Sequence, residues 1–307
     1  MARQPDVEAW YGDSDARDAV GRPGDPRLKP DWSPAFDASS GYAVDAVYCR
    51  TAGPVRELLD PAARSALLAD LPPSRVGHVR RVLLTRAPGS PAGRSPERSR
   101  AAAPRVPVGA LSVIIPSRDR VELLRKCIAS VALNTGLDVE TVVVDNGSAE
   151  PATWAYYDSL PAAARVRVLS SPGPFNFSAL CNLGAEAARG ETFVFLNNDT
   201  WAEEADWLAP LARWANAPGI GAVGPKMIYP SGRLQHAGIV LGLRGLAAHI
   251  DSGLATGDTG YLQQFGHPRE VSAVTGACLA VTAEKFRAVG GFDAVAFPVE
   301  FNDIDLC

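Results

Sequence analysis

Short apolar runs alternate with longer amphipathic stretches in the second part of the chain. Four such runs occupy residues 110–116, 139–145, 165–170 and 192–196, and serine or asparagine follows each of them. Because the runs contain little alternation between polar and apolar positions, they predict strands that are buried on both faces of a sheet.

The segments between these runs have helical character. Apolar side chains recur at helical spacing at Val121, Leu124, Ile128 and Val131. We expect Asp119 to be the N-cap of this helix. Residues 151–160 and 178–190 predict two further helices, the second with Gly190 as its C-terminal cap. Strands that alternate with helices predict an α/β fold with a parallel sheet covered on both faces.

The pattern is less regular beyond residue 219. Residues 221–229 and 271–281 predict strands, and residues 230–232 predict a turn. Residues 282–289 predict a short helix that two glycines close. Residues 299–307 stop in what reads as the first turn of another helix, so we expect the chain to be truncated at its C-terminus.

The first third of the chain has a different composition. Residues 1–40 are polar and rich in Pro, Gly and Asp, and we expect them to be weakly ordered, whereas residues 41–86 suggest a small helical or mixed segment. Residues 87–109 are rich in Pro, Ala and Arg, which predicts a linker. We therefore expect an N-terminal region of uncertain structure over 1–86, this linker, and one incomplete α/β domain over 110–307.

Composition and charge narrow the class of protein. The net charge is −4 over 307 residues, which argues against a nucleic-acid binder. The sequence has no N-terminal signal pattern and no apolar run near the ~20 residues of a membrane span. Five cysteines without CxxC spacing predict reduced thiols. We expect a cytoplasmic protein, and the basic linker leaves open peripheral association with the inner face of the plasma membrane.

Three of the predicted strands end in polar residues. These ends are residues 116–119, 145–148 and 197–199. In open parallel sheets, ligands bind outside the carboxyl ends of the strands, so the three ends together predict a nucleotide site. Any one of them alone is an ordinary turn. The G-x-G-x-x-G pattern at 219–224 is flanked by prolines and does not predict a dinucleotide fold.

The spelling and order of several motifs resemble the family 2 glycosyltransferases, and are similar to bacterial enzymes of O-antigen and other surface polysaccharide assembly. The motifs are "LSVIIPSRDRVELLRKCIASV", "VVVDNGS", "FLNNDT", "VSAVTGACLAV" and "GGFDAVAFPVEFNDIDLC". The resemblance covers about residues 108–307. It implies a GT-A fold, in which a Rossmann-like, mostly parallel sheet flanked by helices is joined to an acceptor-binding half.

The resemblance also implies a set of donor-binding residues. They are Pro116, Ser117, Arg118, Asp145, Asn182 and Asn198. In this set Asp145 matches the aspartate that hydrogen-bonds the nucleobase, and Asn182 faces the diphosphate side. The implied donor is a UDP- or dTDP-linked sugar, and the implied acceptor is a saccharide or a lipid-linked saccharide.

Two carboxylates match the family's metal and catalytic positions. Asp199 matches the last aspartate of the DxD-type motif, where Mg²⁺ or Mn²⁺ would bridge protein and diphosphate. A structural turn at Asp199 is the alternative. Asp303 matches the second acid of the "ED" motif, the usual catalytic base. Asn302 stands where Glu is frequent, and as the expected N-cap it would place Asp303 in a first helical turn, which favours the ionised base.

Thr275 and Gly276 are weaker candidates for the acceptor side. His236 is a candidate for sugar contact or for simple packing, and Asp305 is expected to point away from the base. The sequence therefore predicts an inverting glycosyltransferase that uses a nucleotide-diphosphate sugar. The alternative is a non-catalytic nucleotide- or sugar-binding module of a larger synthase, and a nucleotidyltransferase is a more distant one.

Overall fold

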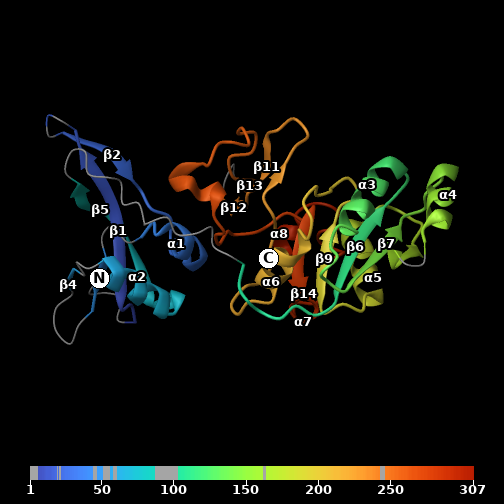
Figure 1. Ribbon diagram of the computed structural model, residues 1–307, viewed down its shortest axis with the longest axis horizontal. Coiled ribbons are helices and arrows are strands. Elements are labelled where there is room, and N and C mark those ends of the chain that lie inside the picture. Colours follow the sequence, from blue (N-terminus) through green and yellow to red (C-terminus); the bar gives the residue numbers. More distant parts are fainter. Residues whose placement is uncertain are drawn as a thin grey trace. The chain divides into compact units, whose positions relative to one another are not determined.

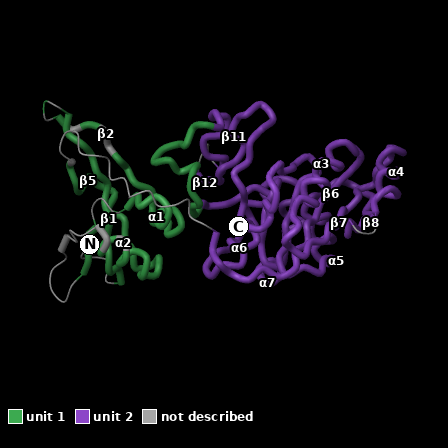
Figure 2. The backbone as a smooth tube through the Cα atoms, in the orientation of Figure 1, with its two compact units in different colours: residues 1–102, 257–270 green, residues 103–256, 271–307 purple. Residues whose placement is uncertain are grey.

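The computed structural model describes residues 6–18, 20, 22–43, 47–50, 56–57, 61–86, 103–161, 164–242 and 246–307. The chain forms two compact units (Figure 2). Unit 1 contains residues 1–102 and 257–270, and unit 2 contains residues 103–256 and 271–307. Most of the linker predicted over 87–109 lies outside the described residues.

Unit 2 is built on a five-stranded sheet with the order β14-β9-β6-β7-β8 (Figure 1). The strands are β6 (Leu111–Ser117), β7 (Val139–Asp145), β8 (Val166–Ser170), β9 (Thr192–Leu196) and β14 (Cys278–Thr282). The first four are parallel to one another and confirm the four predicted strands. The strand predicted over 271–281 is shorter than expected, and it pairs antiparallel with β9.

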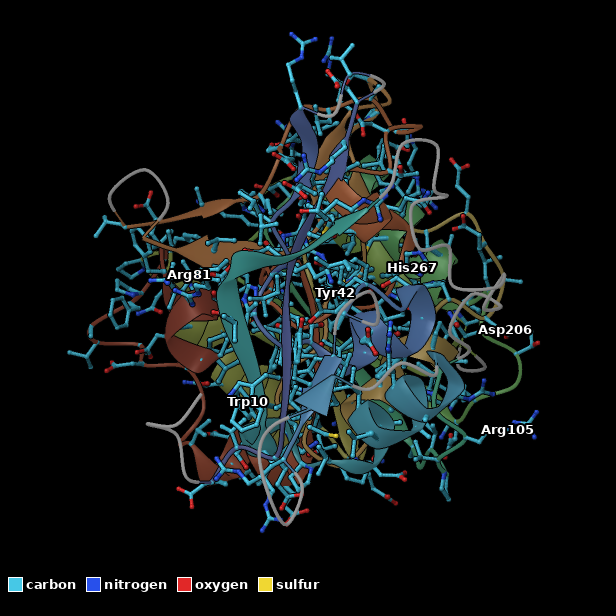
Figure 3. The ribbon with its side chains drawn as sticks, turned by 90° about the vertical axis from the view of Figure 1, so that its left-hand side faces the viewer. Trp10, Tyr42, Arg81, Arg105, Asp206 and His267 are labelled. Carbon is cyan, nitrogen blue, oxygen red and sulfur yellow. The ribbon has the colours of Figure 1, made fainter. Side chains whose placement is uncertain are left out.

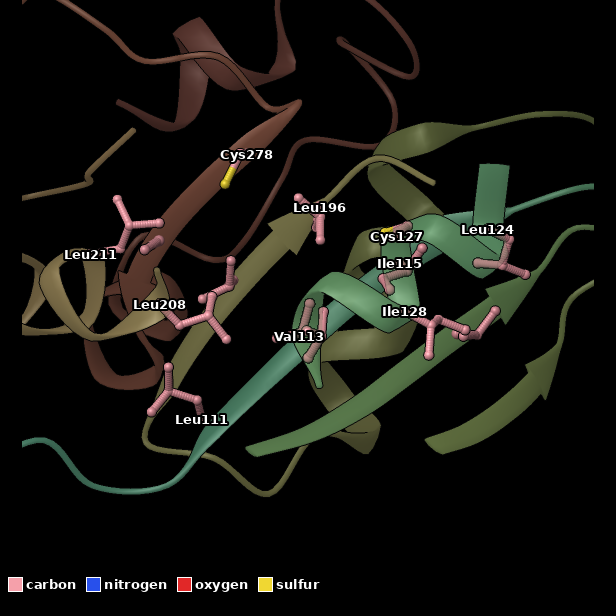
Figure 4. Packing of buried hydrophobic residues seen from close by; sticks show 14 of the residues in the cluster. Leu111, Val113, Ile115, Leu124, Cys127, Ile128, Leu196, Leu208, Leu211 and Cys278 are labelled. Carbon is pink, nitrogen blue, oxygen red and sulfur yellow. The ribbon is translucent and has the colours of Figure 1, made fainter. Parts of the chain in front are cut away.

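Helices cover both faces of this sheet. The helices are α3 (Val121–Val131), α4 (Pro151–Ser159), α5 (Phe177–Ala187), α6 (Leu208–Ala215) and α7 (Ala283–Ala288). One core cluster joins α3, α4 and α6 to alternate strand residues such as Val113 and Ile115 (Figure 4). The other joins α5 and α7 to the intervening residues, such as Ile114 and Phe195. The expected mostly parallel α/β fold is thereby confirmed.

Two predicted helix caps are wrong. Arg120 precedes α3 with a left-handed φ of 54°, and Asp119 makes no capping hydrogen bond to this helix. At the end of α5 the C-cap is Ala188, two residues before Gly190. Gly190 instead lies against β6, where a Cβ would come within 2.5 Å of the Ser112 nitrogen. The glycine is required there by close approach of two backbones.

The remainder of unit 2 consists of short elements. They are β10 (Met227–Ile228), β11 (Leu234–His236), β12 (Ile239–Leu241), β13 (Ala247–His249) and α8 (Asn302–Leu306). The strand predicted over 221–229 shortens to β10 and a single bridge between Val223 and Ala280. The turn predicted at 230–232 is confirmed, because the Gly232 N–H donates to the Tyr229 oxygen (2.8 Å).

Unit 1 has its own sheet and helices. The elements are β1 (Ala9–Arg17), β2 (Pro23–Arg27), α1 (Pro34–Ser40), β3 (Val47–Cys49), β4 (Arg56–Glu57), α2 (Pro61–Asp70) and β5 (Val76–Arg86). The sheet order is β2-β1-β3-β4, and β5 pairs parallel with β1. The mixed character predicted for 41–86 is confirmed by α2 and β5.

The described residues among 6–40 contribute a core to unit 1 that their composition did not indicate. Trp10 and Tyr42, labelled in Figure 3, are buried in unit 1, as are Tyr11 and Phe36. The sequence pattern does not indicate this core, because β1 also buries a charged residue, Asp13. The Asp13 carboxylate accepts the Lys29 backbone N–H (2.8 Å) and lies 3.0 Å from His78 Nε2. These contacts compensate for burying a charge in an otherwise polar-looking strand.

Residues 257–270 complete unit 1. The Glu270 carboxylate binds the Ser33 hydroxyl and accepts the Ala35 N–H (3.1 Å) at the start of α1. The Leu28 N–H donates to the Tyr261 hydroxyl (2.7 Å). All five cysteines of the chain are free. Among the helices of the described residues, none is both long and apolar enough for a membrane span.

We expect Gly184→Ala to lower the free energy of unfolding by about 1–3 kcal/mol, as overpacking does in cores. A Cβ at Gly184 on α5 would lie 2.4 Å from the Ile114 Cγ2 on β6. Better helix propensity offsets at most about 1 kcal/mol of this cost. Urea unfolding measures the effect, and Gly136→Ala, which meets nothing within 4 Å, is the control. Equal stability of the two variants would contradict the close packing of α5 on β6.

Candidate active site

The register of the parallel strands aligns their polar ends. Ser117 at the end of β6 lies opposite Asp145 at the end of β7, and Asp145 lies opposite Ser170 at the end of β8. Pro116, one residue before Ser117, is still buried in the sheet. The predicted convergence of the first two polar strand ends is therefore confirmed by backbone pairing.

The end of β9 joins the same edge through side chains and a turn. The Asn198 Nδ2 donates to the Ser117 Oγ (3.1 Å), which connects the ends of β9 and β6. The Thr200 N–H donates to the Asn197 oxygen (3.1 Å) and closes a turn around Asp199. The turn leaves the Asp199 carboxylate exposed, and no hydrogen bond or ion pair to it occurs among the described residues. Arg118 is exposed as well.

The antiparallel strand β14 brings a further segment to this edge. Because β14 runs opposite to β9, its first residue, Cys278, lies beside Leu196 at the end of β9. The residues just before β14 consequently sit next to the turn, and the Asn197 N–H donates to the Ala277 oxygen (3.0 Å). Thr275 and Gly276 are thereby placed beside residues 197–199.

Gly276 fixes the position of Asp303. The Gly276 N–H donates to the Asp303 Oδ2 (2.8 Å), and the Ile304 N–H donates to Oδ1 (2.9 Å). The Asp303 side chain is half-buried, and each oxygen keeps a lone pair that these bonds do not use. A continuous path of short contacts thus runs from Ser117 through Asn198, the backbone of 197 and 276–277, to Asp303.

The prediction that Asn302 caps α8 is wrong by one position. Phe301 is the N-cap, with a left-handed φ of 61°, and Asn302 is the first helical residue. Asn302 is buried, and its Nδ2 donates to the Val299 oxygen (2.7 Å), so it secures the turn that enters the helix. Asp303 still lies in the first helical turn, as predicted, and Asp305 is exposed two residues later.

Asp145 is enclosed in a hydrogen-bond network. Its Oδ1 accepts the N–H groups of Gly147 (3.0 Å) and Ser148 (2.8 Å). Its Oδ2 accepts the Ser148 and Tyr157 hydroxyls, and the residue is fully buried. Burial and the adjacent carboxylate raise the pKa of Tyr157, which therefore stays a donor. In this arrangement Asp145 holds the turn after β7, and its predicted contact with a nucleobase remains a prediction.

Asp119 clasps the loops that follow β6 and β7. Its Oδ1 accepts the N–H groups of Ala149 and Glu150 (both 2.8 Å), and its own N–H donates to the Ser148 Oγ (2.7 Å). Asp119 and Arg120 both adopt left-handed φ values, 53° and 54°. Non-glycine residues in this region are strained and persist where surrounding contacts hold them, often at functional sites.

The structure gives Asn182 contacts that differ from those expected. Its Nδ2 donates to the Phe292 oxygen (2.8 Å), and its Oδ1 accepts the Phe292 N–H (3.0 Å). Both ends of the amide therefore tie α5 to the segment that follows α7. His236 is also buried, and its Nδ1 lies 2.9 Å from the Nδ1 of His249, which fits the packing interpretation of this histidine.

The thiol of Cys127 and the carboxylate of Asp199 affect which chemistry is available at this edge of the sheet. Cys127 Sγ lies 3.5 Å from the Asn197 oxygen, and burial, together with Cys278 and Asp199, raises the pKa of its thiol. The thiol is thus a protonated donor beneath the turn. Within the described ranges, no three His, Cys, Asp or Glu side chains converge on a metal position. Asp199 fits an ion that takes its other ligands from phosphate and water.

Comparison with known proteins agrees with this geometry. The sequence model described as Glycosyl transferase family 2 matches residues 112–246, which include β6 to β9 and the turn at Asp199. These residues are a family 2 glycosyltransferase domain.

Two curated proteins align with 99% of the chain. One is the uncharacterized protein y4gI of Sinorhizobium fredii, at 33% identity, and the other is the O-antigen biosynthesis protein RfbC of Myxococcus xanthus, at 32% identity. The chain spans only 38% and 27% of the lengths of these two relatives.

A solved structure shares the fold of the family 2 domain. It is GalNAc-T7 with UDP, GalNAc and Mn²⁺, which matches 65% of this chain and 40% of its own length, with a TM-score of 0.50 and 16% sequence identity. The likeness confirms the expected GT-A architecture.

Some contacts of the site had no clear signal in the sequence. The clasp by Asp119, the bridge from Ala277 to Asn197 and the hydroxyl of Tyr157 all join segments that are distant in the chain. The sequence showed the polar residues that follow β6, but it did not show that they bond to the loop after β7. Helix α6 was also missed, although Leu208, Leu211 and Ala215 have helical spacing.

We expect Asp119→Ala to lower the free energy of unfolding of the family 2 domain by about 1–3 kcal/mol, the range for a lost hydrogen bond to a charged group. Asp119→Asn should recover most of this loss, because a single oxygen accepts both N–H groups. Urea unfolding distinguishes the two variants. Equal losses in both would show that charge, and not the clasp geometry, supplies the stability.

Proposed function

We propose that this chain carries out an inverting glycosyl transfer from a nucleotide-diphosphate sugar to a hydroxyl of a saccharide or lipid-linked saccharide, in surface polysaccharide synthesis. The family 2 domain and the likeness to an O-antigen biosynthesis protein support this class of reaction. The observation that carries the proposal is the hydrogen-bonded path that holds Asp303 beside the turn of Asp199.

The donor lies, in this proposal, along the carboxyl edge of β6 and β9. Pro116 and Ser117 end β6, and the Asn198 amide contacts the Ser117 hydroxyl. The side chains of Ser117 and Asn198 are therefore in place to hydrogen-bond a ribose. The exposed guanidinium of Arg118 can pair with a phosphate. Asn182 would reach the diphosphate only if its two bonds to Phe292 opened.

Asp199 is the residue that would hold a divalent cation. Mg²⁺ or Mn²⁺ bound between this carboxylate and the diphosphate would stabilise the negative charge of the leaving group. Mg²⁺ commonly uses one or two protein carboxylates and completes its shell with phosphate and water, so a single exposed aspartate suffices. GalNAc-T7, which shares the fold, was solved with UDP, GalNAc and Mn²⁺, and this supports a divalent cation in the proposal.

Asp303 acts as the general base. The acceptor hydroxyl donates its proton to the carboxylate, the acceptor oxygen bonds to the anomeric carbon, and the bond from that carbon to the diphosphate oxygen breaks. Attack opposite to the leaving group inverts the anomeric centre. The N–H groups of Gly276 and Ile304 orient the carboxylate. Thr275 and Gly276 then lie on the acceptor side.

We expect Asp303→Asn to reduce transfer or hydrolysis of a UDP- or dTDP-sugar by about 10²–10⁴-fold, the usual contribution of a general base. Binding of the nucleotide should be unchanged, because Asn keeps the shape of the side chain. Product release assays and calorimetry measure the two quantities. The matched control is Asp305→Asn, an exposed aspartate on the same helix, which should retain activity.

A non-catalytic binding module is the competing function. Asn302, a neutral amide at a position where the family often has glutamate, favours this alternative. Nucleotide binding without turnover in the unaltered chain, under conditions where Asp303→Asn binds equally well, would establish the binding module and refute the transferase.

We expect removal of Mg²⁺ or Mn²⁺ with EDTA to weaken UDP binding by about tenfold or more, because the diphosphate loses a charge-assisted contact. Asp199→Ala should bind UDP with the EDTA-treated affinity whether or not metal is present. Calorimetric titration measures the dissociation constants. The exposed Asp158 on α4 provides the control variant Asp158→Ala, and metal-independent binding by the unaltered chain would contradict the role of Asp199.

A further inference from the structure

The segment that leads into Asp303 has few side chains that could anchor it. It comprises residues 292–302, and we call it the pre-base segment. Phe292 and Asn302, at its two ends, are buried. In the described stretch 293–301 between them no side chain is buried, and Val295 is 93% exposed. Packing therefore fixes only the ends of the pre-base segment, and hydrogen bonds have to fix the backbone between them.

The Asn182 amide holds the first residue of the pre-base segment. Its Nδ2 donates to the Phe292 oxygen (2.8 Å), and its Oδ1 accepts the Phe292 N–H (3.0 Å). Two bonds to the same residue fix its backbone as a paired residue of a neighbouring strand does. The preceding Gly291 has a φ of 77°, and a Cβ there would lie 2.8 Å from the Asn182 Oδ1. A glycine is thus required for the amide to come this close.

Ser178 and Asn176, at the start of α5, hold the middle of the pre-base segment. The Ser178 Oγ donates to the Phe297 oxygen (2.5 Å), and the Ser178 N–H donates to the Pro298 oxygen (3.3 Å). The Asn176 Nδ2 donates to the Ala294 oxygen (2.9 Å). Ser178 is fully buried, so its hydroxyl is not open to a ligand. Helix α5 therefore supports the pre-base segment through polar side chains along one of its faces.

The last link to the base is made by Asn302. Its Nδ2 donates to the Val299 oxygen (2.7 Å), which closes the turn before α8. Asp303 follows directly, and its carboxylate accepts the Gly276 N–H (2.8 Å). A shift of the pre-base segment would therefore move the Asp303 carboxylate away from the Gly276 N–H.

The direction of α5 carries Asn182 away from the proposed donor. Because α5 joins β8 to β9, two strands of the same parallel set, it runs from the carboxyl edge of the sheet back to the amino edge. Asn182 lies six residues after the N-cap, Asn176, which is about 9 Å along the helix axis. The amide is thus set back from the edge where the diphosphate is proposed to bind, and both of its polar ends are bonded to Phe292.

We propose that Asn182 and Ser178 are positioning residues for the base Asp303, and that neither side chain contacts the donor. They act by holding the backbone of Phe292 and Phe297, which fixes the path of the pre-base segment. The inference rests on the proposed function for the role of Asp303. It gives Asn182 a different task from the diphosphate contact that the family resemblance implies.

The test compares kcat with UDP affinity in Asn182→Ala. We expect kcat for transfer or hydrolysis to fall by about tenfold or more, because a misplacement of about 1 Å at a reacting group can cost about 10²-fold. The dissociation constant of UDP with Mn²⁺ should stay within about threefold of that of the unaltered chain, since the loss is confined to the transition state. Ser178→Ala should show the same pattern.

Asn216→Ala is the matched control. The Asn216 Nδ2 donates to the Thr192 Oγ1 (2.9 Å) and to the Ala212 oxygen (2.8 Å), so this amide also joins two elements through two bonds. Thr192 is the first residue of β9 and lies at the amino edge of the sheet, away from the candidate site. The control should lose similar stability in urea unfolding and keep kcat. Equal losses of kcat in Asn182→Ala and Asn216→Ala would reduce the effect to general destabilisation and overturn the inference.

Hydrogen exchange on the unaltered chain decides the matter even where Asn182→Ala does not fold. We expect the Phe292 N–H to exchange slowly, and to keep this protection when UDP and Mn²⁺ bind. Loss of the protection on binding would show that the Asn182 amide leaves Phe292 for the diphosphate, and would overturn the inference.

The outcomes separate this inference from the proposed function. An unaltered chain that neither transfers nor hydrolyses a nucleotide sugar refutes the proposed function, and the positioning role with it. An active chain in which Asn182→Ala keeps its kcat but binds UDP more weakly refutes only the inference, and assigns Asn182 to the donor.

Discussion

The antiparallel pairing of β14 with β9 is the constraint on which the candidate site depends. A parallel strand at this position would deliver its first residues to the opposite edge of the sheet, about 17 Å away for a five-residue strand. Because β14 runs the other way, Gly276 and Ala277 reach the edge where β6, β7 and β9 end. The N–H of Gly276 then determines where the carboxylate of Asp303 lies.

The same edge contains carboxylates with very different surroundings. Asp145 is buried and saturated with hydrogen bonds, Asp119 is bonded to a neighbouring loop, and Asp199 is exposed. The first two stiffen the loops after β6 and β7, and their bonds offset the cost of desolvating charge. The exposed carboxylate keeps its lone pairs for a ligand. Packing therefore separates the two bonded carboxylates from the exposed one, since all three are aspartates at or just after the end of a strand.

The two units of the chain achieve their cores by different means. Unit 2 buries apolar strands between two layers of helices, and the burial of apolar surface is the main source of its core. Unit 1 buries a smaller cluster in which Tyr42 contacts both Tyr11 and Phe36, and it also encloses Asp13 beside His78. Its stability depends on satisfying buried polar groups as well as on burying apolar surface.

The sequence by itself determined the central sheet, because runs such as Val142–Val144 and Phe193–Leu196 can be buried only as interior strands. It also indicated which polar residues lie at the carboxyl edge of the sheet, since polar residues after such runs must lie at an edge. Local patterns wrongly predicted helix caps at Asp119 and Gly190, and they did not reveal the strands and the helix among the described residues of 6–40 or the direction of β14. Asp119 and Gly190 instead make hydrogen bonds to Glu150 and Ser112, which lie 31 and 78 residues away in the chain. Only the tertiary structure decided these contacts. The packed sheet leaves certain backbone groups unpaired at its edge, and a polar side chain bonds to whichever of those groups lies near it.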